Sequence, residues 1–182
     1  MNKLYQKSEI WFAVIWIIIY VVGTSFAENI SEGIGLSKSI TFIFHVVISV
    51  IVITWLNKNG LFREYGICKP NAPASKFLYY IPLLIIISCN LWFGVTMNLT
   101  ITESILYAGS MICVGFLEEI IFRGFLFKAM AKDSVKAAII VSSITFGIGH
   151  IINLFNGISD VPLATICQII YAIAIGFLFV II

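Results

Sequence analysis

Long apolar runs alternate with short polar connections along the whole chain. A helix needs about 20 mainly apolar residues to cross a bilayer, with a range of roughly 17 to 25. Six stretches reach this length: 10–26, 40–56, 77–95, 104–127, 135–155 and 162–182. The pattern therefore predicts an all-α integral membrane protein of about six transmembrane helices. The connections are too short for a soluble module, so residues 1–182 are expected to form a single polytopic membrane domain.

The Lys and Arg residues outside these stretches fall on alternate connections. Cytoplasmic loops next to membrane helices accumulate basic residues. Nine of the ten loop bases lie at the N-terminus and in the second and fourth connections: Lys3, Lys7, Lys58, Arg63, Lys69, Lys76, Lys128, Lys132 and Lys136. The tenth, Lys38, lies in the first connection. Six spans with a cytoplasmic N-terminus would produce this alternation, so the basic residues predict that orientation.

The composition narrows the class of protein and of partner. The chain is 60% hydrophobic and 11% charged, whereas soluble globular domains carry roughly 25% charged residues. A water-soluble fold could not bury so much apolar surface, so the lipid bilayer is the expected surrounding. The net charge of +2 and the lack of any run of like charges argue against a nucleic-acid partner. The four cysteines are far apart, which favours neither a disulfide framework nor a metal cluster.

Three ionisable residues interrupt the apolar stretch 104–127. They are Glu118, Glu119 and Arg123, and each such residue costs about 2.5 to 3.5 kcal/mol at the centre of a membrane helix. Glu119 and Arg123 are four residues apart, with the acid first, which is the favoured order for an ion pair on one helix face. Glu118 points about 100° away from that face. It is therefore the carboxylate left free to accept and return a proton.

The next apolar stretch supplies a histidine. It contains Phe146-Gly147-Ile148-Gly149-His150, and at about 1.5 Å per residue His150 reaches a depth similar to that of Glu118. Gly147 and Gly149 leave room for close helix approach or for a substrate backbone. A carboxylate and an imidazole that face each other can hold and deprotonate a water, either directly or on a metal. Peptide-bond hydrolysis is the natural chemistry of such a pair.

Together the two motifs resemble those of a known family. Glu-Glu-x-x-x-Arg at 118–123, followed by Phe-x-x-x-His at 146–150 on the next helix, is similar to the CAAX prenyl protease and bacteriocin-processing family, also called the abortive-infection family. The two motifs cover about 40 residues directly. Through the helix arrangement, the resemblance extends over a motif-bearing core of about 104–182.

The resemblance implies an intramembrane glutamate-dependent or metallo-endopeptidase. Glu118 and His150 would activate the attacking water, and Glu119 and Arg123 would form a supporting ion pair. A divalent metal such as zinc, if present, would be bound by Glu118 and His150. The substrate would be a peptide or protein within or at the membrane, either a prenylated CAAX peptide or a bacterial leader peptide. The expected location is the cell membrane, with a bacterial plasma membrane favoured.

The sequence departs from the family pattern near its end. The family carries a further His-x-x-x-Asn or His-x-x-x-Asp motif on a later helix, and no such motif occurs before Ile182. Two explanations are open at this point. Either the sequence is part of a longer protein, or the protein is a degenerate member of the family that protects or binds without cutting.

Other roles for the same residues remain open. Glu118, Glu119 and Arg123 could form a structural ion-pair network, and His150 could be a hydrogen-bonding residue between helices. For the whole protein, the competing functions are a non-catalytic bacteriocin immunity or binding protein of the same family and a small ion-coupled transporter with Glu118 as the proton carrier.

Residues outside the motifs are expected to have structural roles. His45, near the outer end of the stretch 40–56, is expected to be a histidine satisfied by neighbouring side chains. Five aromatic residues are expected to face lipid or the membrane interface: Trp11, Phe12, Trp16, Trp55 and Trp92.

Overall fold

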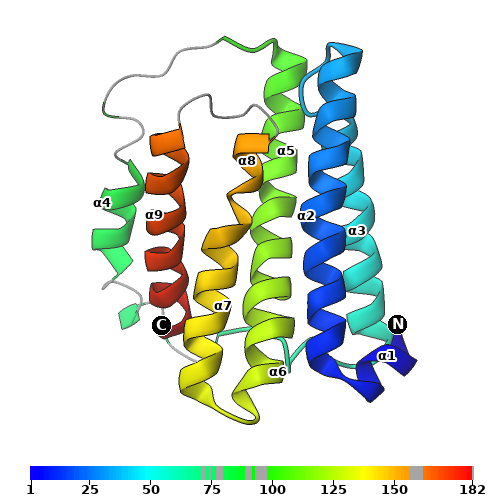
Figure 1. The fold of residues 1–182 in the computed structure, drawn as a ribbon, viewed down its shortest axis with the longest axis vertical. Helices are drawn as coiled ribbons and strands as arrows, with labels where there is room; N and C mark the ends of the chain where they lie inside the picture. Colours follow the sequence, from blue (N-terminus) through cyan, green and yellow to red (C-terminus); the bar gives the residue numbers. More distant parts are fainter. Residues whose placement is uncertain are drawn as a thin grey trace.

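The protein is a bundle of helices that lie side by side (Figure 1). The computed structural model describes residues 1–70, 73, 75–76, 80–88, 92, 98–155 and 162–181. The helices in these residues are α1 (Asn2–Lys7), α2 (Glu9–Ile34), α3 (Ser39–Lys58), α4 (Ile81–Ser88), α5 (Ile101–Glu118), η3 (Glu119–Phe127), α6 (Lys128–Ala131), α7 (Val135–Gly149), α8 (Ile152–Phe155) and α9 (Pro162–Ile181). No strand occurs among them, which confirms the predicted all-α class.

Four helical segments in the described part of the chain are long and apolar enough to cross a membrane. They are α2, α3, α9 and the continuous run Ile101–Ala131 that α5, η3 and α6 form together. The chain is therefore a multi-pass membrane protein. The other two predicted spans are not among these four. In the stretch 77–95 the structure describes residues 80–88 and 92, of which Ile81–Ser88 form the short helix α4, and the rest of this predicted span lies outside the described residues. The stretch 135–155 is broken, because α7 ends at Gly149 after 15 residues and the chain turns before α8.

Polar side chains fix where the long helices begin. Ser8 precedes α2, and its hydroxyl accepts a hydrogen bond from the Trp11 N–H at 3.3 Å. Thr100 and Glu103 form a reciprocal capping box at the start of α5, which satisfies two of the backbone N–H groups that every helix start leaves unpaired. Ser134 caps α7 in the same way as Ser8 caps α2. These short polar side chains convert the ends of the apolar stretches into defined helix ends.

A cluster of aromatic rings fills the bundle near the N-terminal end of α2. Phe12 packs on Trp55 of α3 and Phe125 of η3, with ring centroids 4.8 and 5.0 Å apart. The exposed fractions of Phe12, Trp16 and Trp55 are 1%, 5% and 7%, so the prediction that these three rings face lipid or the interface is wrong. In helices that are apolar on all sides, hydrophobicity alone does not mark the face that points into the bundle. Here the large aromatic rings pack in the interior. Trp11 and Trp92 are exposed, as expected.

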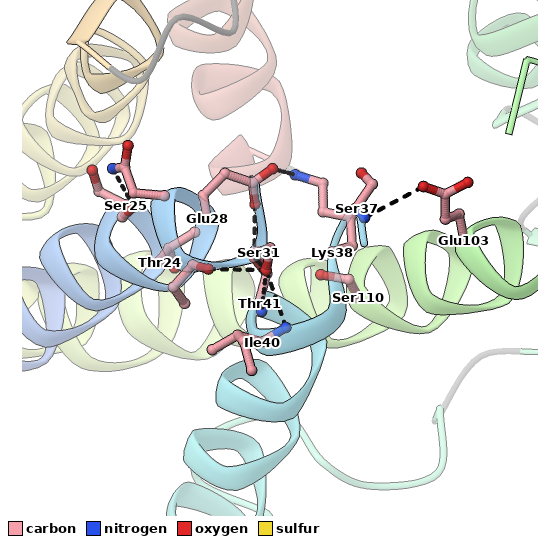
Figure 2. Close-up of polar contacts among 12 residues, drawn as sticks. Thr24, Ser25, Glu28, Ser31, Ser37, Lys38, Ile40, Thr41, Glu103 and Ser110 are labelled. Atoms are coloured by element: carbon pink, nitrogen blue, oxygen red, sulfur yellow. Dashed lines mark hydrogen bonds and ion pairs between the residues drawn. The ribbon is translucent and has the colours of Figure 1, made fainter. Parts of the chain in front are cut away.

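A compact polar cluster lies at the opposite end of α2, where the chain turns into α3 (Figure 2). The Lys38 ammonium lies 2.6 Å from the Glu28 carboxylate, and the Thr41 hydroxyl donates to the same carboxylate at 2.8 Å. The Ser31 hydroxyl oxygen accepts hydrogen bonds from the N–H groups of Ile40 and Thr41 at the start of α3. Lys38, the one loop base that broke the alternation of basic connections, is thus neutralised by a partner.

Two glycines bring α7 and α9 into close contact. A Cβ atom added at Gly147 would lie 2.2 Å from Cγ1 of Ile173 and 2.9 Å from the Ile169 carbonyl oxygen. A Cβ atom added at Gly176 would lie 3.0 Å from Cα of Ser143. At Gly149 it would meet no atom within 4 Å. The two glycines next to His150 therefore have different roles: Gly147 allows close helix packing, and Gly149 leaves open space.

This difference gives a paired test of packing. We expect Gly147→Ala to lower the free energy of unfolding by roughly 1 to 3 kcal/mol, because the added methyl group meets backbone atoms of α9 that cannot move freely. Gly149→Ala should stay within about 0.5 kcal/mol of the parent, as is usual for substitutions without steric conflict. Thermal unfolding of both variants in detergent measures the difference. Equal stability of the two would contradict the packing assigned to Gly147.

Candidate active site

The helix that carries the glutamates changes its geometry at the glutamates themselves. α5 ends at Glu118, and the π-helical segment η3 begins at Glu119 and continues to Phe127. π-helical turns are rare and are frequently found at functional sites. The spacing of the glutamates and Arg123 predicts a regular α-helix here, and this prediction is wrong. The wider turn still leaves Glu119 and Arg123 facing each other, with Oε1 and Nη1 3.7 Å apart, so the expected ion pair is present.

Glu118 has a hydrogen-bond partner that the sequence analysis did not identify. The Tyr20 hydroxyl of α2 donates to Glu118 Oε1 at 3.0 Å, although the two residues are 98 positions apart in sequence. Tyr20 is buried, with 7% of its surface exposed. A phenol in the middle of the apolar stretch 10–26 was the available signal, because a buried tyrosine hydroxyl usually finds a polar partner.

His150 lies where α7 ends, and a backbone carbonyl group of the preceding turn orients its side chain. The imidazole Nδ1 is 3.2 Å from the Phe146 carbonyl oxygen. A carbonyl oxygen can only accept, so this bond places the hydrogen on Nδ1 and leaves the lone pair of a neutral ring on Nε2. The Phe146 ring also packs edge-on against the imidazole, with centroids 5.4 Å apart. The residue that opens the Phe-x-x-x-His motif therefore orients the residue that closes it.

Glu118 and His150 line the same cavity. It has a volume of about 280 Å³ and is also lined by Tyr20 and by the aromatic rings of Phe122 and Phe146. Further along α5, its wall consists of side chains spaced along one helix face: Tyr107, Met111 and Val114. The arrangement brings a carboxylate and an imidazole to one mainly apolar chamber inside the bundle. Such chambers, with a few polar groups placed among apolar walls, are the usual form of small binding and catalytic sites.

One lining residue comes from a helix to which sequence analysis assigned no functional group. Gln168 of α9 contributes to the wall of the cavity. No motif marks this residue, because a lone glutamine within an apolar stretch carries no spacing signal. The cavity is thus lined by residues from helices that are far apart in the sequence: α2, α5, η3, α7, α8 and α9.

Arg123 connects the two motifs. Its side chain is 11% exposed, whereas that of its partner Glu119 is 50% exposed. The guanidinium lies over the Phe146 ring at 4.0 Å and is 5.9 Å from the Phe179 ring of α9. Such cation–π contacts stabilise by about 0.5 to 2 kcal/mol, more when they are desolvated. Through Phe146, the cation of the first motif therefore helps to hold the ring next to His150.

His45 lies in α3 and is not among the residues that line the cavity. Its Nδ1 is 2.8 Å from the Ser110 hydroxyl, and its Nε2 is 3.0 Å from the Thr24 hydroxyl. The side chain is buried, with 1% exposed. The prediction of a histidine satisfied by its neighbours is confirmed, although both partners come from other helices rather than from α3 itself.

A catalytic zinc site normally has three protein ligands. Among the described residues, no group of three or more His, Cys, Asp and Glu side chains lies close enough to hold a metal ion. Glu118 and His150 provide two of the required ligands, and one oxygen of Glu118 already accepts from Tyr20. The described residues therefore do not form a zinc site.

The link between Arg123 and Phe146 can be measured with a double-mutant cycle. We expect Arg123→Gln and Phe146→Leu to show a coupling energy of about 0.5 to 2 kcal/mol in unfolding, the size of a buried cation–π contact. Phe44→Leu is a suitable control partner for Arg123→Gln, because the Phe44 ring packs against Gly23 instead, and its cost should add to that of Arg123→Gln. Additive costs for Arg123 and Phe146 as well would show that the contact carries no energy.

Comparison with known protein families shows what part of this chain is similar to. A comparison with curated proteins and one with solved structures gave no match. Residues 100–182, which contain Glu118, Glu119, Arg123, Phe146 and His150, match the sequence model of the family described as type II CAAX prenyl endopeptidase Rce1-like. The similarity suggested by the two motifs is therefore confirmed. Residues 100–182 are thus similar to the Rce1-like family of type II CAAX prenyl endopeptidases.

Proposed function

We propose that this protein is an intramembrane endopeptidase in which Glu118 and His150 activate a water molecule for attack on a peptide bond. The observation that carries the proposal is that both side chains line one cavity inside the bundle. The family match supports peptide hydrolysis as the reaction class. A structural ion-pair network would explain Glu119 and Arg123, but it would not require a second carboxylate beside a cavity.

The chemistry follows from the two acceptor atoms. A water in the cavity donates one hydrogen to a carboxylate oxygen of Glu118 and the other to Nε2 of His150, which leaves an oxygen lone pair for attack on the substrate carbonyl carbon. As the C–O bond forms, Glu118 takes the proton from the water. The protonated Glu118 then gives this proton to the amide nitrogen, and the C–N bond breaks to give an amine and a carboxylic acid, which loses its remaining proton to water. General acid–base steps of this kind contribute about 10² to 10⁴ in rate.

Glu119 and Arg123 support this pair without contacting the substrate. Their ion pair stabilises the π-helical turn that follows Glu118, and the stacking of Arg123 on Phe146 stabilises the end of α7. In this proposal, a substitution in either residue would disturb both halves of the site. A 1 Å misplacement of reacting groups can cost about 100-fold in rate.

The proposed substrate is a peptide segment at or within the membrane. The cavity walls are mainly aromatic and aliphatic, and the volume of about 280 Å³ fits a short stretch of chain rather than a folded domain. The family name identifies prenylated CAAX peptides as the first class to test, and unmodified bacterial leader peptides are the second class. An internally quenched peptide that ends in a farnesylated Cys-aliphatic-aliphatic-X sequence is a suitable probe.

The main test is Glu118→Gln in purified protein. We expect this change to lower the rate of probe cleavage by at least about 100-fold, because the amide cannot accept the proton of the water. Glu32→Gln is the matched control, since Glu32 lies on the exposed end of α2 and its replacement should leave the rate unchanged. Fluorescence release, with mass spectrometry of the products, measures both variants.

Two outcomes would contradict the proposal. One is cleavage at the parental rate by the Glu118→Gln variant. The other is a folded parental protein that cleaves neither the farnesylated probe nor a panel of unmodified leader peptides, which would support a non-catalytic binding role for the cavity.

A further inference from the structure

The hydrogen bond from Tyr20 to Glu118 connects the site to the part of the chain outside the family match. Tyr20 lies in α2, whereas the matched residues are 100–182. We infer that Tyr20 is a positioning residue of the active site: its hydroxyl holds the Glu118 carboxylate in the one orientation that directs the second carboxylate oxygen to the water. This inference rests on the proposed function of Glu118.

The geometry of the bond supports this role. The donor–acceptor distance is 3.0 Å, and the bond is made to Oε1 alone. A phenol has one hydrogen to donate, so the other oxygen of the carboxylate keeps its lone pairs for a water or a substrate group. Both residues line the cavity, so the bond lies beside the space where the reaction would occur. A glutamate side chain that rotated freely would spend little time in the reactive orientation.

Tyr20 is itself held in place by a second layer of polar residues. Its ring lies 6.0 Å from the His45 ring, with an angle of 31° between the planes. His45 is fixed at both nitrogens by Thr24 of α2 and Ser110 of α5. Residues of α2, α3 and α5 thus meet next to Tyr20. The buried His45 supports the position of the tyrosine ring, although it does not line the cavity.

The hydrogen-bond donor to Glu118 is a neutral phenol and not a cation. Arg123 is paired with Glu119 and stacked on Phe146, so it stabilises its own neighbours. A neutral donor such as a phenol orients a carboxylate without neutralising it, whereas an arginine in the same place would form a strong ion pair and reduce its basicity. Tyr20 therefore suits a carboxylate that has to accept a proton during the reaction.

The test removes one oxygen atom. We expect Tyr20→Phe to lower kcat for the farnesylated probe by about 10- to 100-fold, because the carboxylate loses its fixed orientation, and to leave KM within about twofold. Tyr65→Phe is the matched control: it also removes a buried tyrosine hydroxyl, one that is 2.9 Å from the Tyr5 hydroxyl and outside the cavity lining. It should leave both constants unchanged.

A second readout needs no substrate. Infrared difference spectra identify the carboxylate stretching band of Glu118 by its loss in Glu118→Gln. This band should shift in Tyr20→Phe, stay in place in Tyr65→Phe, and shift in the opposite direction when 3-fluorotyrosine, a stronger donor, is incorporated at position 20. The fluorinated protein keeps every packing contact of the phenol ring, so it tests the inference even if Tyr20→Phe does not fold.

The outcomes separate this inference from the proposed function. An inactive Glu118→Gln variant together with a Tyr20→Phe variant of parental kcat and unshifted band would overturn the positioning role and leave the peptidase proposal intact. A fully active Glu118→Gln variant would overturn the peptidase proposal, and the role of Tyr20 with it. A fall in kcat that Tyr65→Phe reproduces would mean that the loss of any buried tyrosine hydroxyl disturbs the bundle, which also contradicts the inference.

Discussion

The cost of placing charge in an apolar bundle governs the rest of this structure. An ionisable side chain at the centre of a membrane helix costs about 2.5 to 3.5 kcal/mol on insertion scales, so each one needs a partner. Glu119 has Arg123, Glu28 has Lys38, and Glu118 has the Tyr20 hydroxyl. The first two partners neutralise charge, and the third does not. The carboxylate with the neutral partner is also the one that lines the cavity.

The shared role of Arg123 explains why the two motifs occur together. Its ion pair with Glu119 lies within η3, but its stacking partner Phe146 belongs to α7. Phe146 in turn uses its carbonyl oxygen to orient His150. The positions of the two motifs are therefore coupled through one aromatic ring. Within α7 alone, Phe146 is a packing residue. Its contact with Arg123 of η3 is what connects the two motifs.

Sequence alone predicted those features that depend on spacing within one helix or on composition. The i,i+4 distance gave the Glu119–Arg123 pair, and the number and length of apolar stretches gave the all-α membrane class. Tyr20 was missed because its partner is 98 residues away, and no local pattern encodes a contact between α2 and α5. The π-helical segment was missed because no proline marks it, and its one glycine, Gly124, is of a kind that is also frequent in regular membrane helices. The burial of Trp16 and Trp55 was missed because uniformly apolar helices have no polar face to define the inside.

The end of α7 shows how packing far from the chemistry sets the site. Gly147 lets α9 approach so closely that an added methyl group would meet its backbone, and this contact fixes the height and rotation of α7. The helix then stops at Gly149, where a side chain would meet no neighbour, and His150 follows at the rim of the open space. The close contact at Gly147 positions the end of α7 that carries the imidazole. The free space at Gly149 keeps the cavity beside the imidazole open, so both glycines are needed. The location of His150 thus depends on the backbone approach between two helices, while the Phe146 carbonyl oxygen and ring orient its imidazole.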